Sequence, residues 1–66
     1  MRLMINGEPR EVLEGLTLAG LLGELGLDPR MVVVEHNRTI VRRPMLAEVK
    51  VAEGDAVELV HFVGGG

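Results

Sequence analysis

The stretch TLAGLLGELGLDP, from Thr17 to Pro29, carries the clearest helical pattern in the chain and is the starting point for predicting the fold. Its leucines recur at intervals of three and four residues, which is the apolar stripe of an amphipathic helix. Gly20 and Gly23 each cost about 1 kcal/mol relative to alanine inside a helix, so this helix is weak alone. It must be held by packing against a sheet. The residues of the stripe are Leu18, Leu21, Leu22 and Leu25.

The sequence contains recognisable capping signals at both ends of this helix. Thr17 is a natural N-cap, since its hydroxyl can accept a backbone N–H of the first turn. At the other end Gly26 can adopt the left-handed conformation, and Leu27 can then fold back on Leu22. Pro29 follows closely and cannot continue a helix. We therefore expect the helix to begin after Thr17 and to end at Gly26.

The segment before the helix has the pattern of a β-hairpin. Arg2–Ile5 is a strand, Asn6-Gly7 is the pair best suited to the positive φ angles of a two-residue turn, and Glu8–Leu13 returns. In this register Arg10 falls on the inner face, which we explain by a stem that lies along apolar surface with its charge in water. Pro9 cannot donate to a ladder, so its amide position should face solvent or a bulge.

The segment after the helix predicts a second hairpin. Met31–His36 is a β-branched run, Asn37-Arg38 is a turn, and Thr39–Val41 is a short strand. Arg42-Arg43-Pro44 breaks the strand pattern. Met45–Val51 fits either a turn of helix or a short strand, and the sequence leaves both open.

A turn at Glu53-Gly54-Asp55 precedes the final strand, Ala56–Phe62. One helix packed across a mixed sheet of four or five strands, entered by an N-terminal hairpin, is the α+β arrangement of a ubiquitin-like β-grasp domain. The first and last strands of such a fold are usually parallel neighbours at the centre, so the chain leaves from the middle of the sheet. We expect one β-grasp domain over residues 1–63 and a flexible C-terminal glycine tail over residues 64–66.

The final strand is apolar on both faces. We expect Val57 and Leu59 to face the helix stripe, while Val60 and Phe62 lie on the outer face, where a half-exposed strand would normally be polar. Val33 on the middle strand could extend this outer surface. An exposed apolar patch rimmed by charges is typical of an interaction site. The predicted partner-binding residues are Val33, Val60, Phe62 and Val63.

The charged residues give weaker signals. The ten acidic residues are scattered over turns and strand exteriors, as expected of a solvated surface. Arg38, Arg42 and Arg43 gather near the second hairpin. They could dock an acidic partner surface, or they could be ordinary exposed charges.

The composition disfavours several classes of function. A net charge of −3 gives no positive field to hold nucleic acid. No stretch is apolar enough for a signal-peptide core or a membrane span, so we expect a cytoplasmic protein. The chain has no cysteine, and His36 and His61 are its only histidines, with no third ligand at a metal-site spacing. Thr17 and Thr39 are the only hydroxyl side chains, so we expect no enzyme activity, no metal and no bound cofactor.

The end of the chain, Val63-Gly64-Gly65-Gly66, suggests a different kind of chemistry, because the backbone carboxylate of Gly66 becomes the terminal functional group. A carboxylate is a poor electrophile until it is activated, for example as an acyl adenylate, and an activating enzyme must exclude water around it. A narrow channel does so, and only glycine passes along it without a Cβ clash. Four extended residues reach roughly 13 to 14 Å. Gly64 and Gly65 would thus give Gly66 access to a deep site while the domain docks outside.

Taken together, these segments resemble the ThiS family of thiamine-biosynthesis sulfur carriers over essentially the whole chain. The resemblance rests on Asn6-Gly7, VVVEHNRTIV at 32–41, AEGDAVELV at 52–60 and HFVGGG at 61–66. It implies a β-grasp protein whose terminal carboxylate is adenylated by a ThiF-like enzyme that uses ATP. A sulfur-donor system would complete the conversion to a thiocarboxylate, and the sulfur would pass to a ThiG-like thiazole synthase. The family's terminal Gly-Gly falls on Gly65 and Gly66, and Gly64 extends it.

Two alternatives stay open at this level. Other carriers of the same superfamily, namely the small subunit of molybdopterin synthase (MoaD) and carriers for tRNA thiolation or protein modification, share the glycine tail. A non-carrier β-grasp binding module would not need a free glycine end. The short chain, the Asn6-Gly7 hairpin and the HFVGGG ending favour the thiamine branch.

Overall fold

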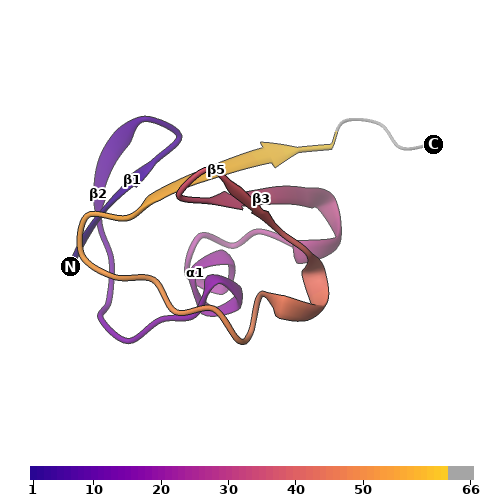
Figure 1. Cartoon of the computed structure of the whole chain (residues 1–66), viewed down its shortest axis with the longest axis horizontal. Helices are drawn as coiled ribbons and strands as arrows, with labels where there is room; N and C mark the ends of the chain where they lie inside the picture. The colour runs from indigo at the N-terminus through magenta and orange to yellow at the C-terminus, as the bar shows by residue number, and fades with distance from the viewer. Residues whose placement is uncertain (63–66) are drawn as a thin grey trace.

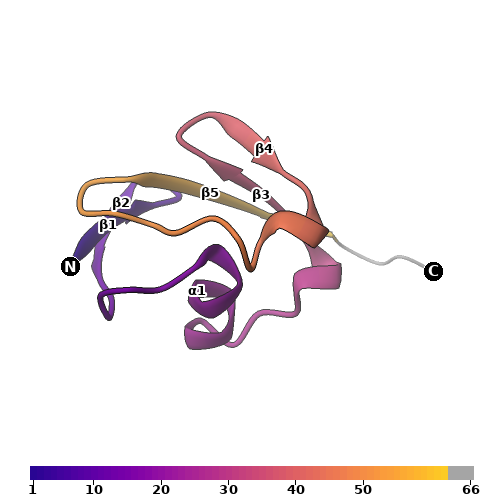
Figure 2. The same cartoon turned by 60° about the horizontal axis from the view of Figure 1, so that its bottom comes forward.

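Over residues 1–62, the part of the chain that this computed structural model describes, a five-stranded sheet in the order β2-β1-β5-β3-β4 is covered on one face by helix α1 (Figures 1 and 2). The β1 and β5 strands run parallel and the other neighbours run antiparallel. The predicted ubiquitin-like β-grasp fold is confirmed, with five strands. The elements are β1 (Arg2–Ile5), β2 (Glu8–Glu11), α1 (Leu18–Glu24), η1 (Pro29–Met31), β3 (Val32–His36), β4 (Thr39–Val41), η2 (Arg43–Met45) and β5 (Ala56–His61).

The β5 strand is the centre of the sheet. On one side Ile5 of β1 lies beside Val57, and on the other side β3 pairs with β5 from Val32 opposite His61 to His36 opposite Val57. The expected parallel pairing of the first and last strands is confirmed. Figure 1 shows that β5 runs away from the N-terminus and leaves the sheet at the far end. The residues that follow β5 therefore start from a strand that is held on both sides.

Both hairpins turn through two residues with positive φ. These angles are 51° at Asn6 and 82° at Gly7 in the first turn, and 50° at Asn37 and 73° at Arg38 in the second. Two successive positive φ angles define the type I′ turn, whose twist matches that of the flanking strands. The turns predicted at both places are confirmed.

The structure of the first hairpin explains how Pro9 and Arg10, which fit the strand pattern poorly, are accommodated. Arg10 lies opposite the fully buried Leu3 yet is itself exposed, because β2 is an edge strand. Met1 and Val12 exchange both backbone hydrogen bonds at 2.8 Å. By alternation Pro9 belongs to a non-hydrogen-bonded pair, so its nitrogen faces the open edge of the sheet, as expected.

The ends of α1 are those that the sequence predicts. The Thr17 hydroxyl accepts the N–H of Gly20 at 3.1 Å. At the other end Gly26 has a φ of 71°, and the N–H of Leu27 donates to the carbonyl of Leu22 at 2.9 Å. This six-to-one bond is the mark of the Schellman motif.

The core lies between α1 and the inner face of the sheet. Val57 is 0% exposed, whereas Leu59, two residues further along the same face, is half-buried. The inward orientation predicted for both is confirmed, and Leu59 is only partly buried where it lines an open pocket with Leu25 and Leu27. Leu25 is likewise only half-buried. The buried apolar residues are Leu3, Ile5, Leu18, Leu21, Leu22, Val32, Val34, Leu46, Val51 and Val57.

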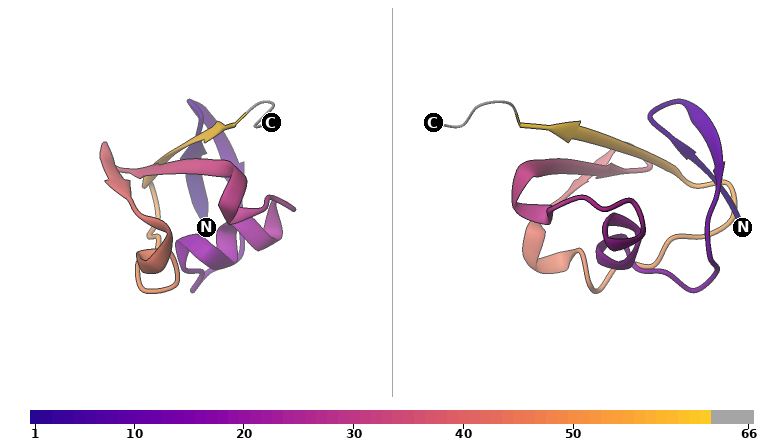
Figure 3. Two further views of the ribbon diagram at one scale, coloured as in Figure 1. Left: turned by 90° about the vertical axis from the view of Figure 1, so that its right-hand side faces the viewer. Right: turned by 180° about the vertical axis from the view of Figure 1, so that it is seen from behind.

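The segment that the sequence left ambiguous closes the core beside α1. The single turn η2 ends at Met45, the first residue of this segment, and the rest forms turns and one isolated bridge between Lys50 and Thr17 rather than a helix or a strand. The N–H of Leu18 donates to the carbonyl of Val49 at 2.8 Å. The side chains of Leu46 and Val51 are buried against the helix side of the sheet. Figure 3 shows η2 and α1 on the same side of the sheet in both views. None of the helices formed by residues 1–62 has the length and apolar character to cross a membrane.

Candidate partner-docking face and the start of the C-terminal tail

The outer face of β3 and β5 carries the predicted apolar surface. Val33 lies directly opposite Val60, and Val60 is 59% exposed. Phe62 is 51% exposed, and its N–H donates to the carbonyl of Met31 at 2.8 Å, so β5 keeps its contact with the β3 side to this point. The predicted placement of these side chains on the outer face is confirmed. Their role in binding partners stays a prediction.

Ile40 belongs to the same surface and was not predicted from the sequence. It lies on β4 opposite Glu35, which shares its face of β3 with Val33, and it is 61% exposed. The register of the second hairpin contained this signal, because the turn at Asn37-Arg38 fixes which residues of the two strands are opposite. The surface, called the outer patch below, consists of Val33, Ile40, Val60 and Phe62.

Arginines rim the outer patch. Arg30, Arg42 and Arg43 line a shallow hollow of about 220 Å³ together with Phe62 and Ile40. Two of the three arginines singled out from the sequence thus lie beside the patch.

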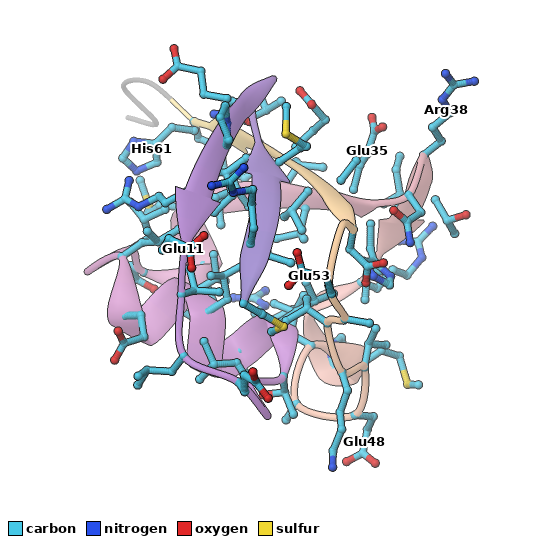
Figure 4. The ribbon with its side chains drawn as sticks, turned by 90° about the vertical axis from the view of Figure 1, so that its left-hand side faces the viewer. Glu11, Glu35, Arg38, Glu48, Glu53 and His61 are labelled. Carbon is cyan, nitrogen blue, oxygen red and sulfur yellow. The ribbon has the colours of Figure 1, made fainter. Side chains whose placement is uncertain are left out.

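Arg38, the third of those arginines, lies apart from the other two. It occupies the tip of the second hairpin, and Figure 4 shows its side chain pointing away from the sheet. Arg42 follows the other end of β4. The structure therefore separates Arg38 from the arginine pair that rims the outer patch.

Arg30 is held in place by its neighbour Asp28. The guanidinium donates to both carboxylate oxygens, with an Nη2 to Oδ2 distance of 2.8 Å. The side-chain hydrogen bond from Arg30 is the main reason that the pKa of Asp28 is lowered to about 2. Because both groups are in water, this pair orients the arginine more than it stabilises the fold.

The two histidines are not brought together. His36 lies opposite Val57 and His61 opposite Val32, at the two ends of the ladder between β3 and β5. Within residues 1–62 no group of three metal-binding side chains occurs. His61 lines an open pocket of about 290 Å³ with Arg10 on the helix side of the sheet.

His36 has a structural partner instead. Its Nε2 lies 2.7 Å from Oδ2 of Asp55, and both side chains are largely shielded from water. Burial alone would raise the pKa of Asp55, but hydrogen bonds from His36 and from the N–H of Ala52 outweigh it, so the pKa is lowered. The pair ties the end of β3 to the turn that precedes β5.

The predicted chemistry of the tail falls on residues beyond the described part of the chain. Val63, Gly64, Gly65 and Gly66 lie outside residues 1–62. What the structure supplies is their point of departure, the end of the central strand next to the outer patch.

A β-grasp domain with this strand order belongs to the ubiquitin-like class. Within that class the chain is a member of the ThiS family, whose model matches residues 3–66. The match extends through the terminal glycines.

Individual relatives agree with this assignment. The chain is 50% identical over all 66 residues to a thiazole synthase of Paramagnetospirillum magneticum, and it spans only 20% of that protein's length. It is 40% identical over 50 residues to the sulfur carrier protein ThiS of Bacillus subtilis, which covers 76% of each chain. The crystal structure of the thiamine biosynthesis protein ThiS of Geobacter metallireducens superposes with a TM-score of 0.86 at 38% identity and covers the whole of both chains.

Proposed function

We propose that this protein is the sulfur carrier of thiamine thiazole biosynthesis and that the carboxylate of Gly66 carries the sulfur. The observation that supports this most directly is the family match, which continues from the β-grasp body through the final glycine. The similar proteins of B. subtilis and G. metallireducens are named as a sulfur carrier and as a thiamine biosynthesis protein. The parallel pairing of β1 and β5 adds a rigid departure point for the tail.

The proposed chemistry starts at the terminal carboxylate. A ThiF-like adenylating enzyme would bind ATP, and a Gly66 oxygen would attack the α-phosphorus and release pyrophosphate. The resulting acyl adenylate is electrophilic, so a sulfide-level sulfur from a donor system can displace AMP and leave a thiocarboxylate. Because Gly64 and Gly65 have no side chains, they would allow the carboxylate to enter a narrow site from which water is excluded.

The outer patch is the proposed docking surface, and Val63, which lies outside the described residues, stays a predicted partner-binding residue. Ordering an extended segment costs about 1 to 2 kcal/mol per residue, so the folded body must contribute binding energy of its own. The exposed Phe62 is the natural anchor, since aromatic residues dominate interface energetics. The arginines beside it favour a partner surface with acidic groups at its rim.

A ThiG-like thiazole synthase is the proposed acceptor of the sulfur. The thiazole synthase of P. magneticum contains a stretch similar to the whole of this chain, which supports a working relationship between the two kinds of domain. A carrier must leave one partner for the next, so we expect modest affinity for each.

The proposal is tested by ATP–pyrophosphate exchange with a ThiF-like enzyme. The 66-residue chain should support exchange, and the same chain without Gly66 should not, while the free energy of unfolding of the two differs by less than about 0.5 kcal/mol. Exchange that persists without Gly66 would place the activated group elsewhere. A Gly65→Leu chain should fold normally and be activated poorly, because its side chain would block a narrow channel.

A further inference from the structure

The side chain of Asn6 continues the sheet at the point where β1 stops. In the described part of the chain, β1 pairs with β5 only as far as Ile5 beside Val57, because the turn at Asn6-Gly7 then leads the backbone away. The N–H of Asn6 still donates to the carbonyl of Val57 at 2.9 Å. The next ladder position on this side of β5 belongs to Leu59.

The Asn6 carboxamide occupies that ladder position. Its Oδ1 accepts the N–H of Leu59 at 2.7 Å, and its Nδ2 donates to the carbonyl of Leu59 at 3.3 Å. A carboxamide offers the same acceptor and donor as a peptide group, so it can replace a strand residue. The second half of β5 is thus held by Asn6 on the β1 side and by the backbone of β3 on the other side.

The turn itself does not require these two bonds. Asn6 has a φ of 51°, a value that glycine adopts at no steric cost, so glycine would serve the turn equally well. Asn37 holds the equivalent place in the second turn, with a φ of 50°, and its Oδ1 accepts the N–H of Ala56 at 2.9 Å. The two turns thus hydrogen-bond to β5 from opposite sides, Asn37 at the start of the strand and Asn6 near its end.

We propose that Asn6 is a positioning residue for sulfur loading, because its two bonds to Leu59 fix the end of β5, from which the chain continues to Gly66. This inference rests on the proposed function. Without the two Asn6 bonds, Leu59–Phe62 is attached to β3 alone. This segment must then be ordered each time the carboxylate enters an activating site, which costs conformational entropy. Phe62 and Val60 of the outer patch lie on the same released segment, so docking and tail entry weaken together.

Three variants separate this role from general stability. Asn6→Gly keeps the turn and removes both side-chain bonds. Asn6→Asp keeps an oxygen acceptor for the N–H of Leu59 and removes the donor to its carbonyl. Asn37→Gly is the matched control, because it makes the same change in the other turn, at the opposite end of β5. Amide hydrogen exchange is read at Leu59 and Phe62, with the helix amide of Leu21 as the reference for global opening.

We expect Asn6→Gly to speed exchange at Leu59 and Phe62 by about tenfold relative to Leu21, because these amides then open locally. With a ThiF-like enzyme and ATP, its kcat/KM for thiocarboxylate formation should fall in proportion to the fraction of molecules that keep an ordered strand end, and this fall reaches about tenfold when the amides of Leu59 and Phe62 exchange nearly as fast as those of an open chain. The exchange rates and the kcat/KM of Asn6→Asp should lie between those of Asn6→Gly and those of the parent chain. Asn37→Gly should leave kcat/KM within about twofold, even at equal loss of thermal stability.

An unchanged exchange rate of the Leu59 amide in Asn6→Gly would show that the Asn6 side chain does not hold the end of β5. Faster exchange with unchanged kcat/KM would overturn its role in loading, and an equal loss of kcat/KM in Asn37→Gly would reduce that role to stability. If the parent chain forms no thiocarboxylate, the proposed function fails and the loading role fails with it. In that case the exchange rates still decide whether Asn6 holds the end of β5.

Discussion

Val33 and Val60 lie directly opposite one another on the face of the sheet that α1 does not cover, and more than half of the Val60 side chain is exposed to solvent. Facing positions on adjacent strands bring side chains within contact distance. Along the same two strands the next pair, Glu35 opposite Glu58, places like charges side by side. The apolar pair lies toward the end of β5 from which the tail departs, so the apolar surface and the tail can reach one partner together.

Removal of the aromatic anchor of the outer patch should weaken partner binding. We expect Phe62→Ala to reduce affinity for the adenylating enzyme and for the thiazole synthase by at least about 1 kcal/mol, because Phe62 is the largest exposed side chain on that face. Its thermal stability should be nearly unchanged. Leu13→Ala is the matched control, since Leu13 is 61% exposed and lies outside the patch. Calorimetric titration measures both variants, and equal affinities for Phe62→Ala and Leu13→Ala would mean that the docking surface is elsewhere.

The alternation along β5 gives a test of the core. Val57→Ala should lower the free energy of unfolding by about 2 to 4 kcal/mol, because the side chain is fully buried and its removal leaves a cavity. Val60→Ala, the same change on the exposed face of the same strand, should alter it by less than about 0.5 kcal/mol. Urea denaturation of both variants provides the comparison. A reversed order would show that the strand is out of register by one residue.

Two glycines at the end of α1 should respond in opposite ways to alanine. A Cβ at Gly23 would meet nothing within 4 Å, and Gly23 has helical backbone angles, so Gly23→Ala should stabilise the protein by about 0.5 to 1 kcal/mol. Gly26 also has open space around it but has a φ of 71°, so Gly26→Ala should destabilise. Thermal denaturation of the pair checks both signs. Stabilisation by Gly26→Ala would contradict the left-handed helix end.

The pair of His36 and Asp55 should make stability depend on pH in acid. The pKa of Asp55 is lowered from its ordinary value of 3.8 in the folded protein. Its contribution is therefore present above pH 3.8, where the carboxylate is charged in both states, and is lost as the pH falls below that value toward the lowered pKa. Asp55→Asn should thus be less stable than the parent at pH 6 and should lose less stability on acidification below pH 3.8. Parallel pH profiles of urea stability would show that Asp55 makes no such contribution.

Local signals in the sequence were sufficient for most of the fold. The stripe of α1, its Thr17 cap and Gly26 end, and the two Asn turns act over a few residues, so they can be recognised without tertiary information. The segment from Met45 to Val51 could not be resolved in this way. Its shape depends on contacts far along the chain, such as the bond from Leu18 to Val49. The sequence of a short apolar segment without periodicity does not indicate which distant residues it will contact.

The candidate site was only partly predictable, for two reasons. Ile40 was missed because its exposure follows from the pairing of β4 with β3, which must be combined with the parity of a third strand. The bonds from Asn6 to Leu59 were not predicted because the Asn-Gly pair already had a sufficient explanation in the turn. Asn6 and Leu59 are far apart in the sequence, so the hydrogen bonds between them cannot be predicted from local pattern.

If Gly66 carries sulfur as a thiocarboxylate, the intact mass of the protein changes when the sulfur is loaded. The chain is incubated with a ThiF-like enzyme, ATP and a sulfur donor, and is then measured before and after addition of a thiazole synthase with its other substrates. We expect a gain in mass equal to the replacement of one oxygen by sulfur. The gain should be located on the C-terminal peptide, absent without ATP and reversed after turnover by the synthase. An unchanged mass under these conditions, or a sulfur located anywhere other than on Gly66, would contradict it.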